Sequence, residues 1–475
     1  MAKPLVQATL PGNQNGTPQT DTQCPGSTLS STSSVAPPRD VVLGEYIFDQ
    51  AKQEYRIKPK QLYRNNLLAA VGLFELTNAL DFPANVWNEV PPKLFAQVLM
   101  GIGGSICFLW SFFGVWDLIR SRRNIKLLWQ ERRDLQCRLA EDGAEKDAKH
   151  ASQVLLQAWL DINYRELGWE YVDRAIMDGI MVIASILVGI GTMLAIRGDI
   201  PVVFDASNLM SGYIGNSFVA LYAVINTAWS VYMWRHASGQ LAAIRNARSG
   251  VDSDTRRRMT AHARQHQLYA AVNAATVLVS GAGSLVSATL WYGYVIIVPC
   301  VFGSVFANLF WRFRLGYNRK SYGEWIGRCV VFDLCSHLTL LHNVRLSVKV
   351  ASLPDIWTKR QNTDDYSDFV RTLEQFGLAD IFGGHLMNIQ ARSDEKSAIS
   401  SGTARTLTGI DVRSCDTASV QSALAKTFAE TNAHTLRDQE RFLLELYGCY
   451  LVGMQKELSR VVEPKQSRER GETTV

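Results

Sequence analysis

Three side chains that can do chemistry share one predicted helix face in the C-terminal third of this chain. Cys329, Asp333 and His337 follow one another at intervals of four residues, which places them on one side of a helix. A carboxylate that orients an imidazole beside a thiol can build a nucleophile, and the same groups can ligate a metal. Val330 and Leu341 lie on this face too, which favours a buried His337 satisfied by Asp333 in an apolar core. The sequence therefore predicts no metal site and no cofactor.

A separate candidate for acid chemistry is Glu75. It follows the apolar run 67–74, and a carboxyl group isolated among apolar residues is suited to proton transfer. If the protein is an enzyme, Glu75 is the best single catalytic residue. The chain contains no HExxH or GxSxG sequence and no phosphate-binding lysine motif, so no familiar catalytic motif supports that reading.

Polar residues also recur along the predicted membrane helices. Asn273 begins a series of small and hydroxylated residues at intervals of three or four, and Asn216 begins a similar series in the preceding helix. Such a seam lets two helices approach closely and form hydrogen bonds across their interface. A groove that binds a ligand is the alternative. Its polar contacts would be Asn216, Tyr222, Asn226 and Asn273.

The elements that position these residues are membrane helices. Residues 268–311 contain no Asp, Glu, Lys, Arg or His over 44 positions. One helix of that length would extend about 66 Å, roughly twice the hydrocarbon thickness of a bilayer. The segment therefore folds back on itself, and the bend is predicted at 291–294, where Gly293 lies among aromatic residues.

Further spans are predicted at 95–118, 177–196 and 212–234, each followed by basic residues or a polar loop. The segment 65–84 is ambiguous, because Glu75 and Asp81 interrupt an apolar stretch. It is either a sixth span or an interfacial helix. The fold class is therefore an all-α polytopic transmembrane bundle of five or six spans with a helical cytoplasmic tail.

The Arg-rich segment 235–266 sets the orientation. It contains Arg256, Arg257 and Arg258 in a row, and positive-inside logic places it in the cytoplasm together with the C-terminus. The expected partners of these basic loops are the lipid bilayer and its anionic headgroups, not nucleic acid. The predicted location is the endomembrane system or the plasma membrane.

The regions fall into five parts. Residues 1–44 are rich in Ser, Thr, Pro and Gly and are predicted to be disordered; 45–118 enter the membrane; 119–176 form a cytoplasmic helical loop; 177–311 form a four-span bundle; and 312–475 form the tail. Within the tail, helices are predicted at 322–350, 365–376 and 419–461, with a chain break at Gly383-Gly384 and a mobile loop at 392–415. The apolar stripe of the 419–461 helix is expected to pack on the 322–350 helix, or to bind a protein partner or a second copy.

This layout resembles that of uncharacterised multi-pass integral membrane proteins of filamentous fungi, some encoded among genes of secondary metabolism. The resemblance covers the whole layout, carries over no residue role and implies an accessory role or an unrecognised membrane enzyme. The function predicted from the sequence is a non-enzymatic membrane scaffold or accessory protein. The alternatives are a facilitative carrier or pore for a small apolar molecule, and a membrane-embedded enzyme acting on a lipid-soluble substrate.

Overall fold

The computed structural model divides the chain into two units, residues 1–37 and 38–475, and its described residues all belong to the second. The described residues are 41–49, 54–57, 62–65, 76–77, 79–87, 89–142, 150–247, 251–322, 334–349, 370, 373–374, 378–393, 406–412, 415–430 and 433–471.

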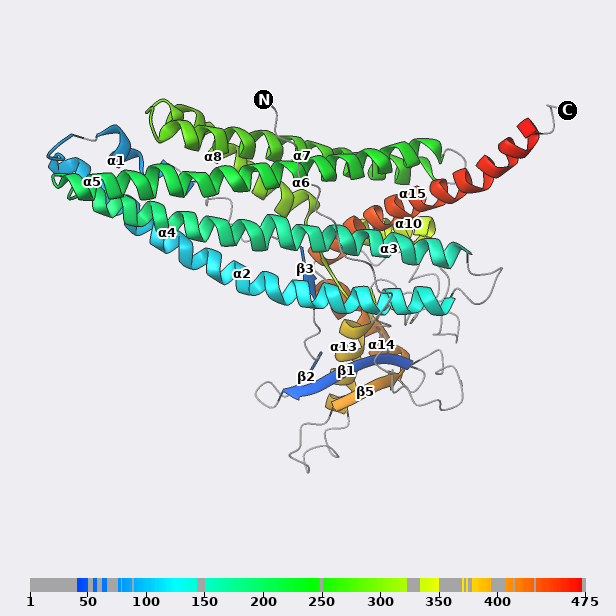
Figure 1. Cartoon of the computed structure of the whole chain (residues 1–475). Helices are drawn as coiled ribbons and strands as arrows, with labels where there is room; N and C mark the ends of the chain where they lie inside the picture. Colours follow the sequence, from blue (N-terminus) through cyan, green and yellow to red (C-terminus); the bar gives the residue numbers. More distant parts are fainter. Residues whose placement is uncertain are drawn as a thin grey trace, which may run out of the picture. The chain divides into compact units, whose positions relative to one another are not determined.

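Five helical stretches within these residues are long and apolar enough to cross a membrane, which confirms the predicted class (Figure 1). They contain helices α2 (Leu94–Asp142), α4 (Met177–Ala195), α6 (Asn216–Asn246), α7 (Ser253–Ser287) and α8 (Gly293–Phe310). Helix α3 (His150–Trp169) runs into α4 through a π-helical segment, η2 (Glu170–Ile176). Helix α5 (Pro201–Ser207) leads into α6 through a second one, η3 (Asn208–Gly215).

Helix α2 continues well beyond its apolar part, as the repeat of Leu128, Leu135 and Leu139 predicts, and Leu128 and Leu135 are buried. Helix α6 also continues to Asn246, and α7 begins at Ser253. The expected loop 235–266 is therefore mostly helical, and that expectation was wrong. Its basic residues lie on the extensions of two membrane helices, where Arg is compatible with a helix.

The predicted hairpin is confirmed by the break between α7 and α8. Helix α7 ends at Ser287 and α8 begins at Gly293, so the turn lies within residues 288–292. A Cβ atom added to Gly293 would lie only 2.6 Å from the backbone nitrogen of Ser287. A glycine is needed here because the two helices approach through their backbones.

Residues before α2 contact both ends of α8. The backbone N–H of Asn65 donates to the carbonyl of Tyr317, just beyond α8. Asp81 accepts a hydrogen bond from the hydroxyl of Tyr294, at the start of α8, over 2.8 Å. The hydroxyl of Thr77 lies 3.2 Å from that of Ser185, in the middle of α4. Residues 66–75 lie outside the described residues, so the choice between a sixth span and an interfacial helix at 65–84 stays a prediction.

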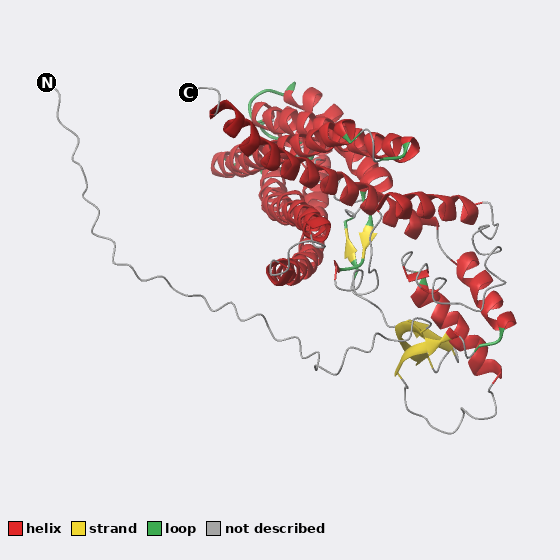
Figure 2. Ribbon diagram, turned by 90° about the vertical axis from the view of Figure 1, so that its right-hand side faces the viewer, coloured by secondary structure: helices red, strands yellow, loops and turns green. Residues whose placement is uncertain are grey.

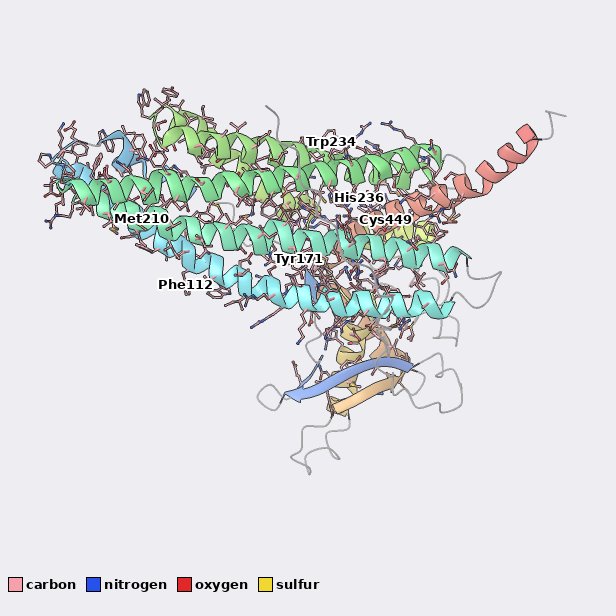
Figure 3. All side chains as sticks on the ribbon, in the orientation of Figure 1. Phe112, Tyr171, Met210, Trp234, His236 and Cys449 are labelled. Carbon is pink, nitrogen blue, oxygen red and sulfur yellow. The ribbon has the colours of Figure 1, made fainter. Side chains whose placement is uncertain are left out.

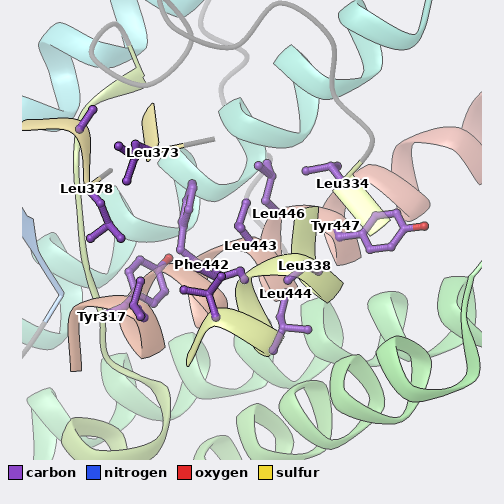
Figure 4. Packing of buried hydrophobic residues seen from close by; sticks show 14 of the residues in the cluster. Tyr317, Leu334, Leu338, Leu373, Leu378, Phe442, Leu443, Leu444, Leu446 and Tyr447 are labelled. Carbon is purple, nitrogen blue, oxygen red and sulfur yellow. The ribbon is translucent and has the colours of Figure 1, made fainter. Parts of the chain in front are cut away.

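In the tail, helix α15 (Ala433–Gly471) packs against α3, α6 and α10 (Leu334–Lys349). The stripe predicted on it is largely buried: Leu443 and Leu446 belong to the main hydrophobic cluster, whereas Leu458 is 62% exposed (Figure 4). Packing within the chain is thus confirmed, with α3 and α6 as additional neighbours. The single helix expected at 419–461 was wrong, because α14 (Thr417–Glu430) and α15 are separate elements.

Two other predictions for the tail need correction. Gly383 and Gly384 do not break the chain, since both lie inside α13 (Ala379–Ser393), which other parts of the tail cover. Part of the loop expected at 392–415 is strand β5 (Thr406–Asp411). Its alternation of Thr and apolar residues suits a strand. Of the helix expected at 322–350, residues 334–349 form α10, and residues 323–333 lie outside the described residues. The helix expected at 365–376 lies largely outside them.

Two small sheets join the beginning of the chain to the tail, which an all-α prediction omitted (Figure 2). Strand β1 (Val41–Asp49) lies between β2 (Glu54–Ile57) and β5, with antiparallel pairing on both sides. Strand β3 (Tyr63–Arg64) pairs with β4 (Asn318–Arg319) beside the end of α8. Residues 41–44 of the segment predicted to be disordered thus belong to β1, and residues 1–40 lie outside the described residues.

Candidate functional site

The structure describes one of the four predicted catalytic residues, His337. Glu75, Cys329 and Asp333 lie outside the described residues. His337 lies on α10 and is buried, with Leu338 and Leu341 of the main hydrophobic cluster beside it in sequence. This setting agrees with the interpretation of His337 as a core residue.

Three of the four predicted ligand-binding residues do meet, in a closed polar network between α6 and α7. The amide of Asn226 donates to Tyr222 and to Asp173, each over 2.7 Å. The amide of Asn273 donates to the side-chain oxygen of Asn226, also over 2.7 Å, and to Ser230. All these groups are buried, and the hydrogen bonds between them join η2, α6 and α7.

The fourth residue, Asn216, lies ten positions earlier on α6 and does not take part. Its side chain is fully buried, and neither its amide nitrogen nor its oxygen has a hydrogen-bond partner. An unsatisfied buried amide costs about 1–3 kcal/mol, so this position is strained energetically.

The sequence missed a buried ionic cluster at the junction of α2 and η2. Arg174 binds Asp117 over 2.7 Å and Glu170 over 2.9 Å, and all three side chains are almost fully buried. Ser121 and Asn124 of α2 donate further hydrogen bonds to Glu170. The cluster ties η2 to α2 where the apolar part of the spans ends.

A second buried cluster ties the start of the tail to α2 and α3. Arg319 donates to both oxygens of Glu131 over 2.7 Å and also pairs with Glu166. Burial opposes the charge on Arg319, but the two carboxylates outweigh it and hold its pKa well above the usual value. The bidentate geometry is one that only a guanidinium group provides.

Tyr317 connects this cluster to α15. Its hydroxyl lies 2.8 Å from Glu166 and 3.2 Å from Glu445, and it accepts a hydrogen bond from Arg165. Arg165 in turn forms an ion pair with Glu445. Burial raises the pKa of Glu445 above its usual value, although the adjacent Arg165 acts in the opposite direction.

An apolar groove lies at the other end of the bundle, between α2 and α8. It has a volume of about 820 Å³ and is lined by Leu99 and Ile102 from α2, Val295 and Val298 from α8, and the segment 79–87, which includes helix α1 (Phe82–Val86). Leu99, Ile102, Val295 and Val298 are 38–62% exposed. All four belong to candidate membrane spans, so the groove opens at an apolar surface of the bundle.

One glycine allows the groove to form. A Cβ atom added to Gly103 would lie 2.5 Å from the carbonyl oxygen of Leu80, so only glycine lets the 79–87 segment rest against α2. The apolar run around Gly103 is visible in the sequence, but its contact with the 79–87 segment is not. Sequence reasoning therefore predicted that small residues let helices pack closely, but it did not locate this groove.

The groove has one small polar edge. The Tyr294 hydroxyl donates to Asp81 over 2.8 Å, and the amide of Asn85 donates to Asp81 and Tyr294. Phe82 packs edge-on against the ring of Tyr294, with ring centroids 5.1 Å apart. A mostly apolar cavity with a few convergent polar groups is the usual form of a small-molecule site.

Comparison with known proteins adds no family to these observations: no family model, no curated protein and no solved structure matches the chain.

Proposed function

We propose that this multi-pass membrane protein is a non-enzymatic accessory protein that holds a lipid-soluble molecule in the groove between α2 and α8. The observation that carries the proposal is the apolar groove of about 820 Å³, lined by side chains from two candidate spans. Its volume is within the range of about 300–1,000 Å³ that is typical of small-molecule sites. The bilayer itself would supply the ligand.

The ligand expected from this lining is largely apolar with one hydrogen-bonding group. Rings and aliphatic chains would lie against Ile102, Val295 and Val298. A single hydroxyl or carbonyl would reach Tyr294, the polar residue of the lining that Asp81 and Asn85 hold in place from behind. A charged ligand does not fit, because desolvating an ion costs several kcal/mol and no described residue of the lining carries a countercharge.

The orientation proposed from the sequence places the groove near the membrane face opposite the cytoplasm. The Arg-rich ends of α6 and α7 and the tail would then be cytoplasmic. A scaffold that recruits partners through α15 is less well supported, because Leu443 and Leu446 already pack inside the chain. The function of the groove does not depend on that recruitment.

The proposal is tested by photo-labelling the full chain in lipid nanodiscs with a diazirine-bearing sterol and, separately, a diazirine-bearing fatty acid. Val298→Trp fills the groove and should abolish labelling of α2 and α8. Val279→Trp is the matched control, since Val279 lies on α7 outside the lining and is 44% exposed, against 45% for Val298. Equal labelling of both variants, or labelling spread evenly over all lipid-facing helices, would refute a specific site.

A further inference from the structure

Two histidines in the N-terminal half of α7, away from the groove, face each other inside the protein. His262 and His266 are one helical turn apart and only 6% and 4% exposed. Their Nε2 atoms are 3.3 Å apart. Only one proton can lie between two such nitrogens, so one ring must donate and the other accept. The remaining ring nitrogen of His266, Nδ1, is buried without a hydrogen-bond partner.

The separation of the two nitrogens matches a known coordination geometry. In a tetrahedral zinc site with Zn–N bonds of about 2.0–2.1 Å, two ligand nitrogens lie about 3.3 Å apart. The pair could therefore hold an ion with little movement of either ring. Glu445 supplies a third donor from α15, since its carboxylate and both imidazole nitrogens lie within 4.8 Å of one another.

A network of ion pairs surrounds Glu445. Through Tyr317 and Arg319, the buried cluster joins Glu131, Glu166 and Glu445 to Arg165 and Arg319. The guanidinium of the buried Arg441 lies beside this cluster and donates to the carbonyl of Gly316. These contacts fix the position of Glu445 next to the two histidines.

The partners of Glu445 are compatible with ligation. A carboxylate has about four lone-pair sites, and Arg165 and Tyr317 occupy only some of them. Carboxylates that bind metals are commonly held in place by such hydrogen bonds. Arg165 and Tyr317 would therefore orient Glu445 toward the histidines while the third donor closes on the ion.

We propose that His262, His266 and Glu445 bind one divalent transition-metal ion, with zinc the best fit to two imidazoles and one carboxylate. The site is buried. Its role would be structural: the ion fastens α15 of the tail to α7 of the membrane bundle. Figure 3 labels His236 and Cys449, which lie where α6 meets α15. Cys449 accepts a hydrogen bond from Gln240 and is not among the proposed ligands.

The test uses the full chain in detergent, freed of metal with a chelator and titrated with Co²⁺, whose visible spectrum reports tetrahedral coordination. Wild type should bind one Co²⁺ per chain, with Zn²⁺ displacing it. His262→Gln and His266→Gln should each lose the tetrahedral bands, and Glu445→Gln should weaken binding at least about tenfold, the size expected when a supporting or third ligand is lost. His434→Gln removes an exposed imidazole of α15 and should bind as wild type does.

Two further measurements keep the proposal falsifiable if a variant fails to fold. X-ray absorption of the zinc-loaded wild type should show imidazole ligands and no sulfur, and Cys449→Ser should retain the visible bands. A wild-type chain that shows no tetrahedral bands, or a zinc spectrum without imidazole, would overturn the proposal. So would well-folded His262→Gln and His266→Gln variants that bind Co²⁺ as tightly as His434→Gln does.

Discussion

Replacing Arg319 by Met should destabilise the protein more than any other single change among the ion pairs of the tail. The guanidinium of Arg319 is 3% exposed and is bound to Glu131 and Glu166, which are 3% and 0% exposed. Its removal leaves two carboxylates buried together without their cation. Breaking a buried pair in this way costs about 3–5 kcal/mol.

Lys93→Met provides the matched control. Lys93 also pairs with a glutamate, Glu89, over 2.9 Å, but the two side chains are 59% and 56% exposed. Water already solvates both charges there, so losing that pair should cost less than about 1 kcal/mol. The same chemical change therefore tests burial and not the mere existence of an ion pair.

A triple variant separates charge from packing. Arg319→Met combined with Glu131→Gln and Glu166→Gln removes the uncompensated charges, while the one amide oxygen left at position 131 can still accept from Trp159 or Asn163. Most of the stability lost in Arg319→Met should return. Unfolding in mixed detergent micelles, followed by circular dichroism, measures all three variants. If Arg319→Met unfolds at the same detergent fraction as Lys93→Met, the buried cluster does not stabilise the fold as argued.

Three other predictions concern the groove, the tail and the topology. Gly103→Ala should displace the 79–87 segment from α2 and reduce photo-labelling of the groove, because the added Cβ would meet the Leu80 carbonyl; unchanged labelling would contradict the assigned contact. Leu446→Asp, at a fully buried position, should destabilise the tail by about 3 kcal/mol or more. Leu458→Asp, at an exposed position, should change the stability by no more than about 0.5 kcal/mol. Thermal melting of the full chain measures both. A protease site inserted between residues 247 and 251 should be cut only from the cytoplasmic side, and cleavage from the opposite side would reverse the topology.

Much of the membrane fold was predictable, because the signals that define it are local. An uncharged run longer than a bilayer and the aromatic turn near Gly293 are visible in the sequence alone. The spans near 95–118 and 177–196 correspond to parts of α2 and α4. The apolar repeat after 118 likewise predicts that α2 continues. Each of these inferences needs only a stretch of sequence and its periodicity.

The polar interior was not predictable in the same way, because its partners are distant in sequence. Arg319 meets Glu131 across 188 residues and Glu166 across 153. When each of these residues is read only with its neighbours in sequence, it resembles a solvated charge beside a membrane. The strands show the same limit: residues 406–411 alternate as a strand does, but β1, which pairs with them, lies near the start of the chain.

The histidine pair illustrates how one local assumption conceals a site. His262 and His266 were counted within an Arg-rich loop, where residues four apart need not share a face. Once α7 is seen to begin at Ser253, the same spacing places both rings on one side of a helix. Glu445 could join them only through the fold of the tail. The residues that the sequence offered as a possible metal site were therefore Cys329, Asp333 and His337, because their spacing was judged on a predicted helix.

Four buried carboxylates are engaged by partners within the chain. Glu131 and Glu166 both bind Arg319, and Glu170 binds Arg174. Asp81 is buried as well and accepts hydrogen bonds from Tyr294 and Asn85. The contacts with Arg319 and Tyr294 join segments that are separate in the fold, and a buried charge is tolerated only when it is paired in this way. These carboxylates are therefore arranged to hold helices together.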